Sequence, residues 1–309
     1  MTSKYPSGIQ YELNYKNQKV ILVQVGGGIR SYSIANNEIL DTYPIDEMSH
    51  HSQGQILSPW PNRIKDGKYC FDEKRYQLDI NEVNKNTAIH GLVRWRNWDG
   101  VKIKSNIIKM THVLLPSPGY PFSLYFEITY HLGDNGLKIN TKVTNIGSCP
   151  APFGIGYHPY LKINSNDNNI DECFLQSPGT TRLISDSSSI PISKKDLDKD
   201  EFDFRDEKQI AKLKLDTCFT NLKRDTTGLA NVYLSDKTKK KKIRLWMDSS
   251  YEFLMLFSGD TFSIDKQRKS LAIEPMSCAP NAFQSGLGLI TLIPNDTFKG
   301  NWGISPIQY

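Results

Sequence analysis

Glu274 and His158 are the two residues of this chain whose types and contexts best suit acid–base chemistry. Glu274 ends the apolar run Leu271-Ala-Ile and is followed at once by proline. His158 stands between the approach Gly154-Ile-Gly-Tyr and Pro159. A carboxyl group and an imidazole have unperturbed pKa values of about 4.3 and 6.5, which burial and neighbouring charges can move toward neutrality. Together they would take a proton from one substrate atom and give a proton to another.

Three further polar side chains would supply donors and acceptors for a polyhydroxylated ligand. His90 directly precedes a glycine, Asp216 lies in Leu215-Asp-Thr-Cys-Phe, and Arg63 follows Pro59-Trp-Pro-Asn. We expect the two prolines to keep Arg63 on a loop rather than in a ladder, because proline cannot donate a hydrogen bond to a sheet. Polar groups on turns beside short strands are a common way to build a ligand site on a rigid scaffold.

Each of these residues also has an ordinary structural explanation. Glu274 fits a strand-end glutamate turned to water, and His158 fits a core histidine bonded to backbone. His90 fits a turn residue and Asp216 an Asx-turn or cap. The functional interpretation depends on the combination of these residues, which together could bind a polyhydroxylated ligand and exchange protons with it. The other four histidines are predicted to be structural: His50, His51, His112 and His131.

No motif for other chemistry competes with this acid–base set. The sequence has no Gly-x-Ser-x-Gly elbow, metal-ligand spacing or dinucleotide fingerprint, so we expect neither cofactor nor metal. Gly26–Gly28 is predicted to be a tight turn, because no helix pattern or Lys-Ser/Thr follows. The five cysteines are scattered and form no CxxC pair, which indicates reduced thiols in a cytoplasmic protein.

The elements that must position these residues are predicted to be β-strands. Apolar and polar residues alternate over 98–104, 109–115, 123–132 and 137–143, with turn signals between them. Helical periodicity is nearly absent; its best candidate, 194–212, lacks an apolar stripe and is predicted to be irregular. The polar run 164–169 is predicted to be an exposed loop tip. No linker or repeat divides the chain, so we expect one all-β domain over 1–309.

Composition limits the class of partner. The 309 residues are 38% hydrophobic with a net charge of +5, and the mean hydropathy is −0.47. The basic run 237–244 is predicted to be a solvated hairpin whose lysines protect an edge strand, since no nucleic-acid signature accompanies it. No apolar run approaches the roughly 18 residues that span a membrane. We therefore expect neither a nucleic acid nor a membrane as partner.

The motifs taken together resemble the aldose 1-epimerase (galactose mutarotase-like) family, in particular relatives that carry a Pro-Trp-Pro-Asn-Arg-Ile motif. The resemblance implies a large antiparallel β-sandwich of the galactose mutarotase type (a supersandwich) with a sugar cleft on one sheet. It covers nearly the whole chain. The matching segments are PWPNRIKDGKY (59–69), AIHGLVR (88–94), GYPFSL (119–124), GLKINTKVTNIG (136–147), GYHPYL (156–161), LDTCF (215–219) and LAIEPMSCAPNAF (271–283).

The resemblance also implies cofactor-free interconversion of the α and β anomers of a hexose or related aldose. It makes Glu274 the general base for the C1 hydroxyl and His158 the general acid for the ring oxygen. His90, Arg63 and Asp216 would bind the ring hydroxyls. An aromatic side chain is expected to stack on the sugar, and Trp60 and Trp95 are the candidates.

The sequence leaves several alternatives open for the substrate, the activity and the oligomeric state. The Pro-Trp-Pro segment departs from the better-studied galactose mutarotases, and Arg63, Arg94 and Arg96 leave an acidic or modified hexose open as substrate. A non-catalytic sugar-binding sandwich would keep the cleft without turnover. Glycoside hydrolysis needs two carboxylates, for which Asp216 would be the partner of Glu274. Either a monomer or a homodimer is compatible with the sequence.

Overall fold

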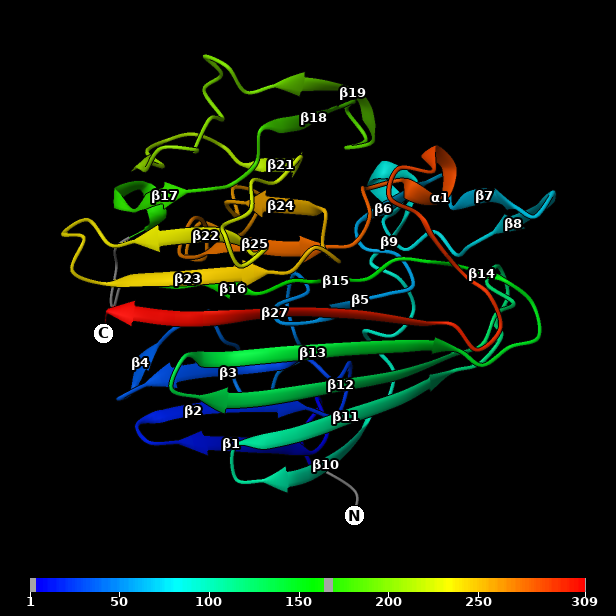
Figure 1. The fold of residues 1–309 in the computed structure, drawn as a ribbon, viewed down its shortest axis with the longest axis horizontal. Helices are drawn as coiled ribbons and strands as arrows, with labels where there is room; N and C mark the ends of the chain where they lie inside the picture. Colours follow the sequence, from blue (N-terminus) through cyan, green and yellow to red (C-terminus); the bar gives the residue numbers. More distant parts are fainter. Residues whose placement is uncertain (1–3, 164–168, 309) are drawn as a thin grey trace.

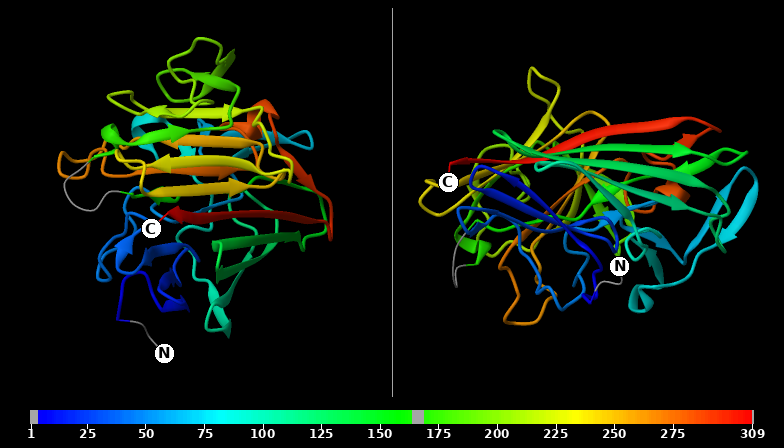
Figure 2. Two further views of the ribbon diagram at one scale, coloured as in Figure 1. Left: turned by 60° about the vertical axis from the view of Figure 1, so that its left-hand side comes forward. Right: turned by 90° about the horizontal axis from the view of Figure 1, so that it is seen from below.

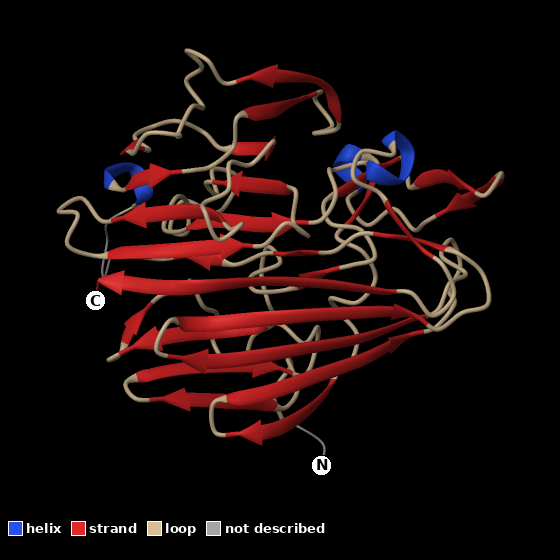
Figure 3. Ribbon diagram, in the orientation of Figure 1, coloured by secondary structure: helices blue, strands red, loops and turns tan. Residues whose placement is uncertain are grey.

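The computed structural model describes residues 4–163 and 169–308, and almost all of their regular structure is β-strand (Figure 3). Within these residues, helix is confined to α1 (Ala282–Ser285) and the 3₁₀ turns η1 (Val83–Lys85) and η2 (Ile170–Glu172). The predicted all-β class is confirmed. The predicted loop tip 164–169 lies, apart from its last residue, outside the described residues.

Two large antiparallel sheets build most of the molecule (Figure 1). In spatial order, the nine strands of the first sheet are β10 (Asp99–Lys104), β11 (Ile107–Leu114), β12 (Leu124–Gly133), β13 (Gly136–Asn145), β27 (Thr297–Gln308), β23 (Lys242–Met247), β22 (Ala230–Ser235), β17 (Phe174–Gln176) and β20 (Lys208–Gln209). The second sheet has eight strands, β19 (Pro191–Asp196), β18 (Thr181–Ser185), β21 (Asp216–Thr220), β24 (Phe253–Phe257), β25 (Leu271–Met276), β15 (Gly156–Tyr157) and β5 (Ile56–Leu57), with β16 (Tyr160–Leu161) also paired to β25.

The inner faces of the two sheets meet in a shared apolar core. In β12 every second side chain is fully buried, as Phe126 and Ile128 show, because successive side chains of a strand point to opposite faces. The second sheet contributes Phe219, Leu254 and Ile273 to the same cluster. The predicted β-sandwich is therefore confirmed.

Smaller sheets complete the fold. The first of them packs β1 against β11 and β12 (Figure 2). Its second and third strands are joined by a turn in which Gly26 and Gly27 have φ of 83° and 63°, as predicted for the three glycines. The strands are β1 (Gln10–Tyr15), β2 (Gln18–Val23), β3 (Ile29–Ile34) and β4 (Asn37–Glu38), and the pairs β6 (Arg63–Lys65) with β9 (Thr87–Ile89), β7 (Lys68–Phe71) with β8 (Lys74–Gln77), and β14 (Ala151–Phe153) with β26 (Ile290–Leu292).

The structure agrees with the prediction for one of two charged segments and differs from it for the other. The segment 194–212 is irregular over 197–207, as predicted, but its first three residues belong to β19 and residues 208–209 form β20. The basic run forms the β22–β23 hairpin, but β23 lies between β22 and β27, so the expected protection of an edge strand is wrong. Its lysines instead pair with carboxylates, among them Lys239 with Glu207 at 2.7 Å. None of the helices formed by the described residues is long and apolar enough for a membrane crossing.

Candidate active site

A cavity of about 400 Å³ contains five of the seven predicted site residues. It lies between one face of the eight-stranded sheet, the short β6–β9 ladder and the loops near His51 and Phe262. The five residues come from segments spread over more than 200 positions of the chain. They are Arg63, His90, His158, Asp216 and Glu274.

Strand register places both carboxyl groups on the cavity face of the sheet. Met255 on β24 lies opposite Glu274 on β25, and Phe257 lies opposite Asp216 on β21. Residues opposite each other across antiparallel strands point to the same face, and residues two apart on one strand do so as well. Glu274 and Asp216 therefore share a face, while the alternate residues of these strands fill the core.

His158 reaches the same face from the end of β15. Gly156 pairs with Met276, and His158 follows two residues later, so the alternation directs its ring toward Glu274. The approach needs a glycine, because a Cβ at Gly156 would lie 2.9 Å from the Cβ of Pro61. The His158 ring stacks on Tyr160 with centroids 4.8 Å apart, which fixes its plane.

Glu274 and His158 form a buried acid–base pair. The Nε2 atom of His158 lies 3.4 Å from Oε1 of Glu274, and the two residues are 5% and 2% exposed. Burial and the nearby Asp216 charge raise the pKa of the Glu274 carboxyl well above its ordinary value, and Arg63 opposes this only in part. Burial lowers the pKa of His158 to about 3. Oε2 of Glu274 has no hydrogen-bond partner among the described residues.

His90 is held by a reciprocal backbone contact with Asn62. The His90 N–H donates to the Asn62 carbonyl at 2.9 Å, and the Asn62 N–H donates to Nδ1 of His90 at 3.2 Å. A backbone donor on Nδ1 leaves the ring proton on Nε2 in the neutral imidazole. Burial, together with the neighbouring His158, Arg94 and Arg63, lowers the pKa of His90 well below its ordinary value, so the ring is a neutral donor at pH 7.

Arg63 is placed by a strand rather than by the predicted loop. It begins β6 and pairs with Ile89 on β9, so the loop prediction is wrong. The prolines end two residues earlier, and Asn62 has a φ of 56°, so the chain turns before the ladder begins. Two hydrogen bonds of 2.7 and 2.9 Å bind the Arg63 guanidinium to the Glu82 carboxylate.

Arg94 is a cavity residue that the sequence prediction did not assign to the site. It donates to the Ser52 hydroxyl at 3.1 Å, while its buried Nε has no partner among the described residues. Burial lowers the pKa of its guanidinium. Its place in the AIHGLVR segment, four residues after His90, is the signal that would have identified it.

The predicted stacking tryptophans do not line the cavity, so that prediction is wrong. Trp60 is 2% exposed in the core, where its indole N–H donates to the Ala88 carbonyl at 3.2 Å. Trp95 is 47% exposed outside the cavity. The aromatic wall is instead made of Tyr160, Phe257, Phe262 and His51, whose ring stacks on Phe262 with centroids 3.8 Å apart.

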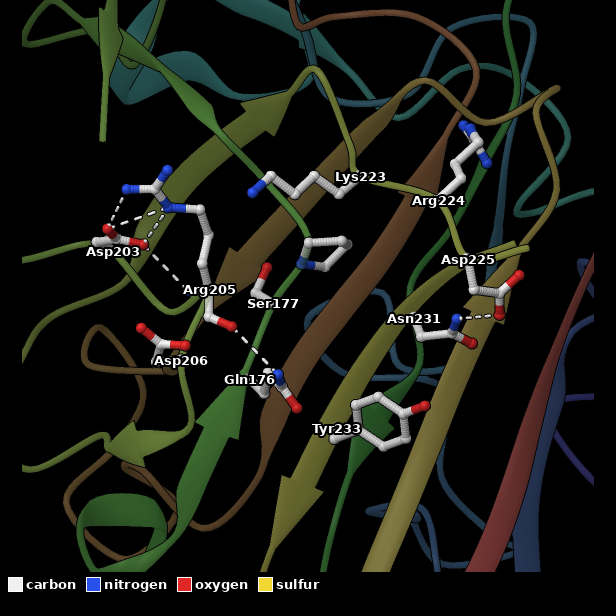
Figure 4. Close-up of a pocket in the computed structure, with 11 residues that line it drawn as sticks. Gln176, Ser177, Asp203, Arg205, Asp206, Lys223, Arg224, Asp225, Asn231 and Tyr233 are labelled. Atoms are coloured by element: carbon white, nitrogen blue, oxygen red, sulfur yellow. Dashed lines mark hydrogen bonds and ion pairs between the residues drawn. The ribbon is translucent and has the colours of Figure 1, made fainter. Parts of the chain in front are cut away.

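A second cavity of about 450 Å³ lies beside β17 and β22 and has a different character (Figure 4). Two of its arginines bind neighbouring protein groups: Arg205 contacts Asp203, and Arg224 donates to the Tyr251 carbonyl. It contains no histidine to pair with a carboxyl group. Throughout the described residues, no group of three or more His, Cys, Asp or Glu side chains could hold a metal ion. Another cavity holds the His50–Glu47 pair, but both of these side chains are about 45% exposed, so the Glu274–His158 cavity is the candidate acid–base site with a buried pair.

Known proteins with similar sequences and folds indicate the family of this chain. The chain is 32% identical over 293 residues to the uncharacterized protein YihR of Escherichia coli, covering 94% of this chain and 91% of that protein. It is 31% identical over 122 residues to the galactose mutarotase of Sus scrofa, covering 37% and 33% of the two chains.

Solved structures share the fold over nearly the full length. A GalM/aldose epimerase homologue from Caenorhabditis elegans superposes with a TM-score of 0.85 at 21% identity, covering 97% of this chain and 99% of that one. The galactose 1-epimerase of Lactobacillus acidophilus superposes with a TM-score of 0.81 at 18% identity, covering 99% and 98%. The family model for aldose 1-epimerase matches residues 10–305. This chain therefore belongs to the aldose 1-epimerase family, with the β-sandwich of galactose mutarotases.

Proposed function

We propose that the protein is an aldose 1-epimerase that interconverts the α and β anomers of a hexose or related aldose in the Glu274–His158 cavity. The observation that carries the proposal is the contact of a buried carboxyl group with a buried imidazole at 3.4 Å, in a cavity of about 400 Å³. Family membership supports this reaction type.

In this mechanism the Glu274 carboxylate takes the proton from the C1 hydroxyl. The oxygen electrons form the C1 carbonyl, the bond from C1 to the ring oxygen breaks, and His158 donates a proton from Nε2 to that oxygen. Rotation about C1–C2 turns the other face of the aldehyde toward the ring hydroxyl. Closure returns the proton to His158, and Glu274 gives its proton back to the C1 oxygen.

Burial makes the Glu274 carboxylate a stronger base and the protonated His158 ring a stronger acid, while it favours the neutral form of both groups. A general base is most effective when its pKa lies near the working pH, and burial moves the Glu274 pKa upward in that direction. The reaction starts from the ionised Glu274 carboxylate and the protonated His158 ring. Transfer of the carboxyl proton from Glu274 to His158 converts the neutral pair into this form, so the pair neither gains nor loses a proton. Arg63, His90 and Asp216 would bind the ring hydroxyls.

Anomer exchange of freshly dissolved α-glucose and α-galactose, followed by polarimetry or NMR, tests the proposal. We expect acceleration by the protein, and we expect Glu274→Gln and His158→Asn to lose about 10²–10⁴-fold of the rate, since one positioned acid or base contributes that much. Glu127→Gln is the matched control, because Glu127 pairs with Lys109 on the other sheet.

Two outcomes would contradict the proposal. Full rates in both variants would remove Glu274 and His158 from the chemistry. Saturable sugar binding without acceleration, over a panel of neutral and acidic aldoses, would identify a binding protein rather than an enzyme.

A further inference from the structure

We propose that Glu82 is a positioning residue of this site, which holds the Arg63 guanidinium at the sugar cavity and neutralises that charge beside Glu274. This inference rests on the proposed function and deepens it. Glu82 lies outside the segments that carry the family resemblance and shows no catalytic pattern in the sequence.

The contact geometry leaves Arg63 little freedom. Oε2 of Glu82 accepts from Nε of Arg63 at 2.7 Å, and Oε1 accepts from a terminal nitrogen at 2.9 Å. The Thr87 hydroxyl also donates to Oε2, at 2.5 Å, and so holds the carboxylate as well. A two-pronged arginine–carboxylate pair fixes orientation as well as distance. The Arg63 side chain is only 11% exposed, so the pair is largely removed from solvent.

An isolated backbone bridge ties Glu82 to the ladder that carries Arg63. Glu82 and Thr87 exchange both of their backbone hydrogen bonds, at 3.1 and 3.2 Å. Thr87 belongs to β9, which pairs with β6, and Arg63 begins β6. Carboxylate and guanidinium are therefore carried by segments whose relative position is set by hydrogen bonds, which is what an oriented binding group requires.

The second consequence is electrostatic. Burial opposes ionisation of Glu82, but the hydrogen bonds from Arg63 and Thr87 outweigh it and hold the carboxyl pKa below its ordinary value. Arg63 thus faces the cavity as half of a neutral pair. The titratable and charged groups around Glu274 on its neighbouring elements are Asp216, Cys218, His158, Tyr160 and Arg63. Without Glu82, the Arg63 charge would favour the ionised form of Glu274 more strongly than it does in the pair.

The variant Glu82→Gln tests both consequences. Its amide keeps one acceptor for Thr87 but places a donor against Arg63. We expect kcat/KM to fall about tenfold, mainly through KM, and the acidic limb of the pH profile to move to lower pH. Glu127→Gln, which breaks the ion pair between Glu127 on β12 and Lys109 on β11, is the control and should leave both quantities unchanged.

A double-mutant cycle separates positioning from a general structural role. If Glu82 acts through Arg63, Glu82→Gln should raise KM by less than about twofold once Arg63→Met is present, because coupled residues are not additive. An equal rise in KM in both backgrounds would overturn the inference. So would an unchanged KM and pH profile in the single variant.

The inference and the proposed function fail in different ways. If the wild-type protein accelerates exchange but Glu82→Gln behaves like the control, the proposed function stands and the inference falls. If no aldose is turned over, the proposed function falls, and the Kd of the bound sugar, measured by calorimetry in the same four variants of the cycle, tests the positioning role alone.

Discussion

At the scale of single residues, the candidate site contains a carboxyl group that opposes folding at neutral pH. Glu274 is 2% exposed, and its Oε2 has no hydrogen-bond partner among the described residues. Burial raises its pKa, so the folded protein holds a proton that the unfolded chain releases. Between the unfolded pKa of about 4.3 and the raised folded value, stability is therefore lost as the pH rises.

We expect Glu274→Gln to be more stable than the wild-type protein at pH 8 and of similar stability at pH 4.5. The amide carries no titrating proton, so the difference should grow through this window, and one pKa unit is equivalent to about 1.4 kcal/mol. Urea unfolding at several pH values measures the change. Glu127→Gln should show no such growth, and a constant difference for Glu274→Gln at all pH values would contradict the argument.

At the scale of elements, the turn after β9 aims the His90 ring into the cavity. His90 and Gly91 both have left-handed backbones, with φ of 66° and 69°. Such a conformation is unfavourable for a histidine, and here it is held by the two contacts with Asn62. Gly91 is also in close contact with the chain before Pro59, since a Cβ there would lie 2.1 Å from the Ser58 carbonyl oxygen.

Gly91→Ala is expected to destabilise the protein by about 3 kcal/mol or more, because backbone strain and a backbone clash act together. Gly228→Ala is the matched control. Gly228 has a φ of 82°, but beyond its chain neighbours no atom lies within 4 Å of the position that a Cβ would occupy, so only strain of about 1 kcal/mol remains. Chemical denaturation measures both. Equal losses would show that the approach to Ser58 is unimportant.

At the scale of the whole molecule, buried hydroxyl groups connect the two large sheets. Thr141 on β13 contacts the Tyr157 hydroxyl on β15 at 2.6 Å and the Tyr251 hydroxyl at 3.0 Å. All three residues are almost completely buried. Because Tyr157 directly precedes His158, this connection also ties the sheet that carries the acid–base pair to the other half of the sandwich.

Thr141→Val is expected to destabilise the protein by about 1–3 kcal/mol, since it removes a hydrogen-bond partner from buried hydroxyls while preserving volume. Thr144→Val on the same strand is the control, because Thr144 contacts Thr297 on the outer face. It should change stability by less than about 0.5 kcal/mol. Similar effects of the two substitutions in thermal unfolding would contradict a role for the buried network.

Local patterns predicted the strands well and the site in part. The alternation of apolar and polar residues predicts that Phe126 and Ile128 lie in the core, because the period of two follows from strand geometry alone. The turn signals between the alternating segments likewise coincide with the observed turns. Five of the seven expected site residues meet in one cavity. The two tryptophans were misplaced because sequence neighbours of a site residue need not share its face: Trp60 points into the core three positions before Arg63.

The sequence by itself determined the fold class and the family and made Glu274 and His158 candidates for acid–base chemistry, since these depend on periodicity and on motifs within short segments. Only the tertiary structure decided which groups surround that pair. The pairing of β21, β24 and β25 brings Asp216, Phe257 and Glu274 onto one face. The bridge from Glu82 to Thr87 of the β6–β9 ladder brings Glu82 to Arg63. Such neighbours are set by strand register and packing between distant segments, to which no single stretch of sequence gives access.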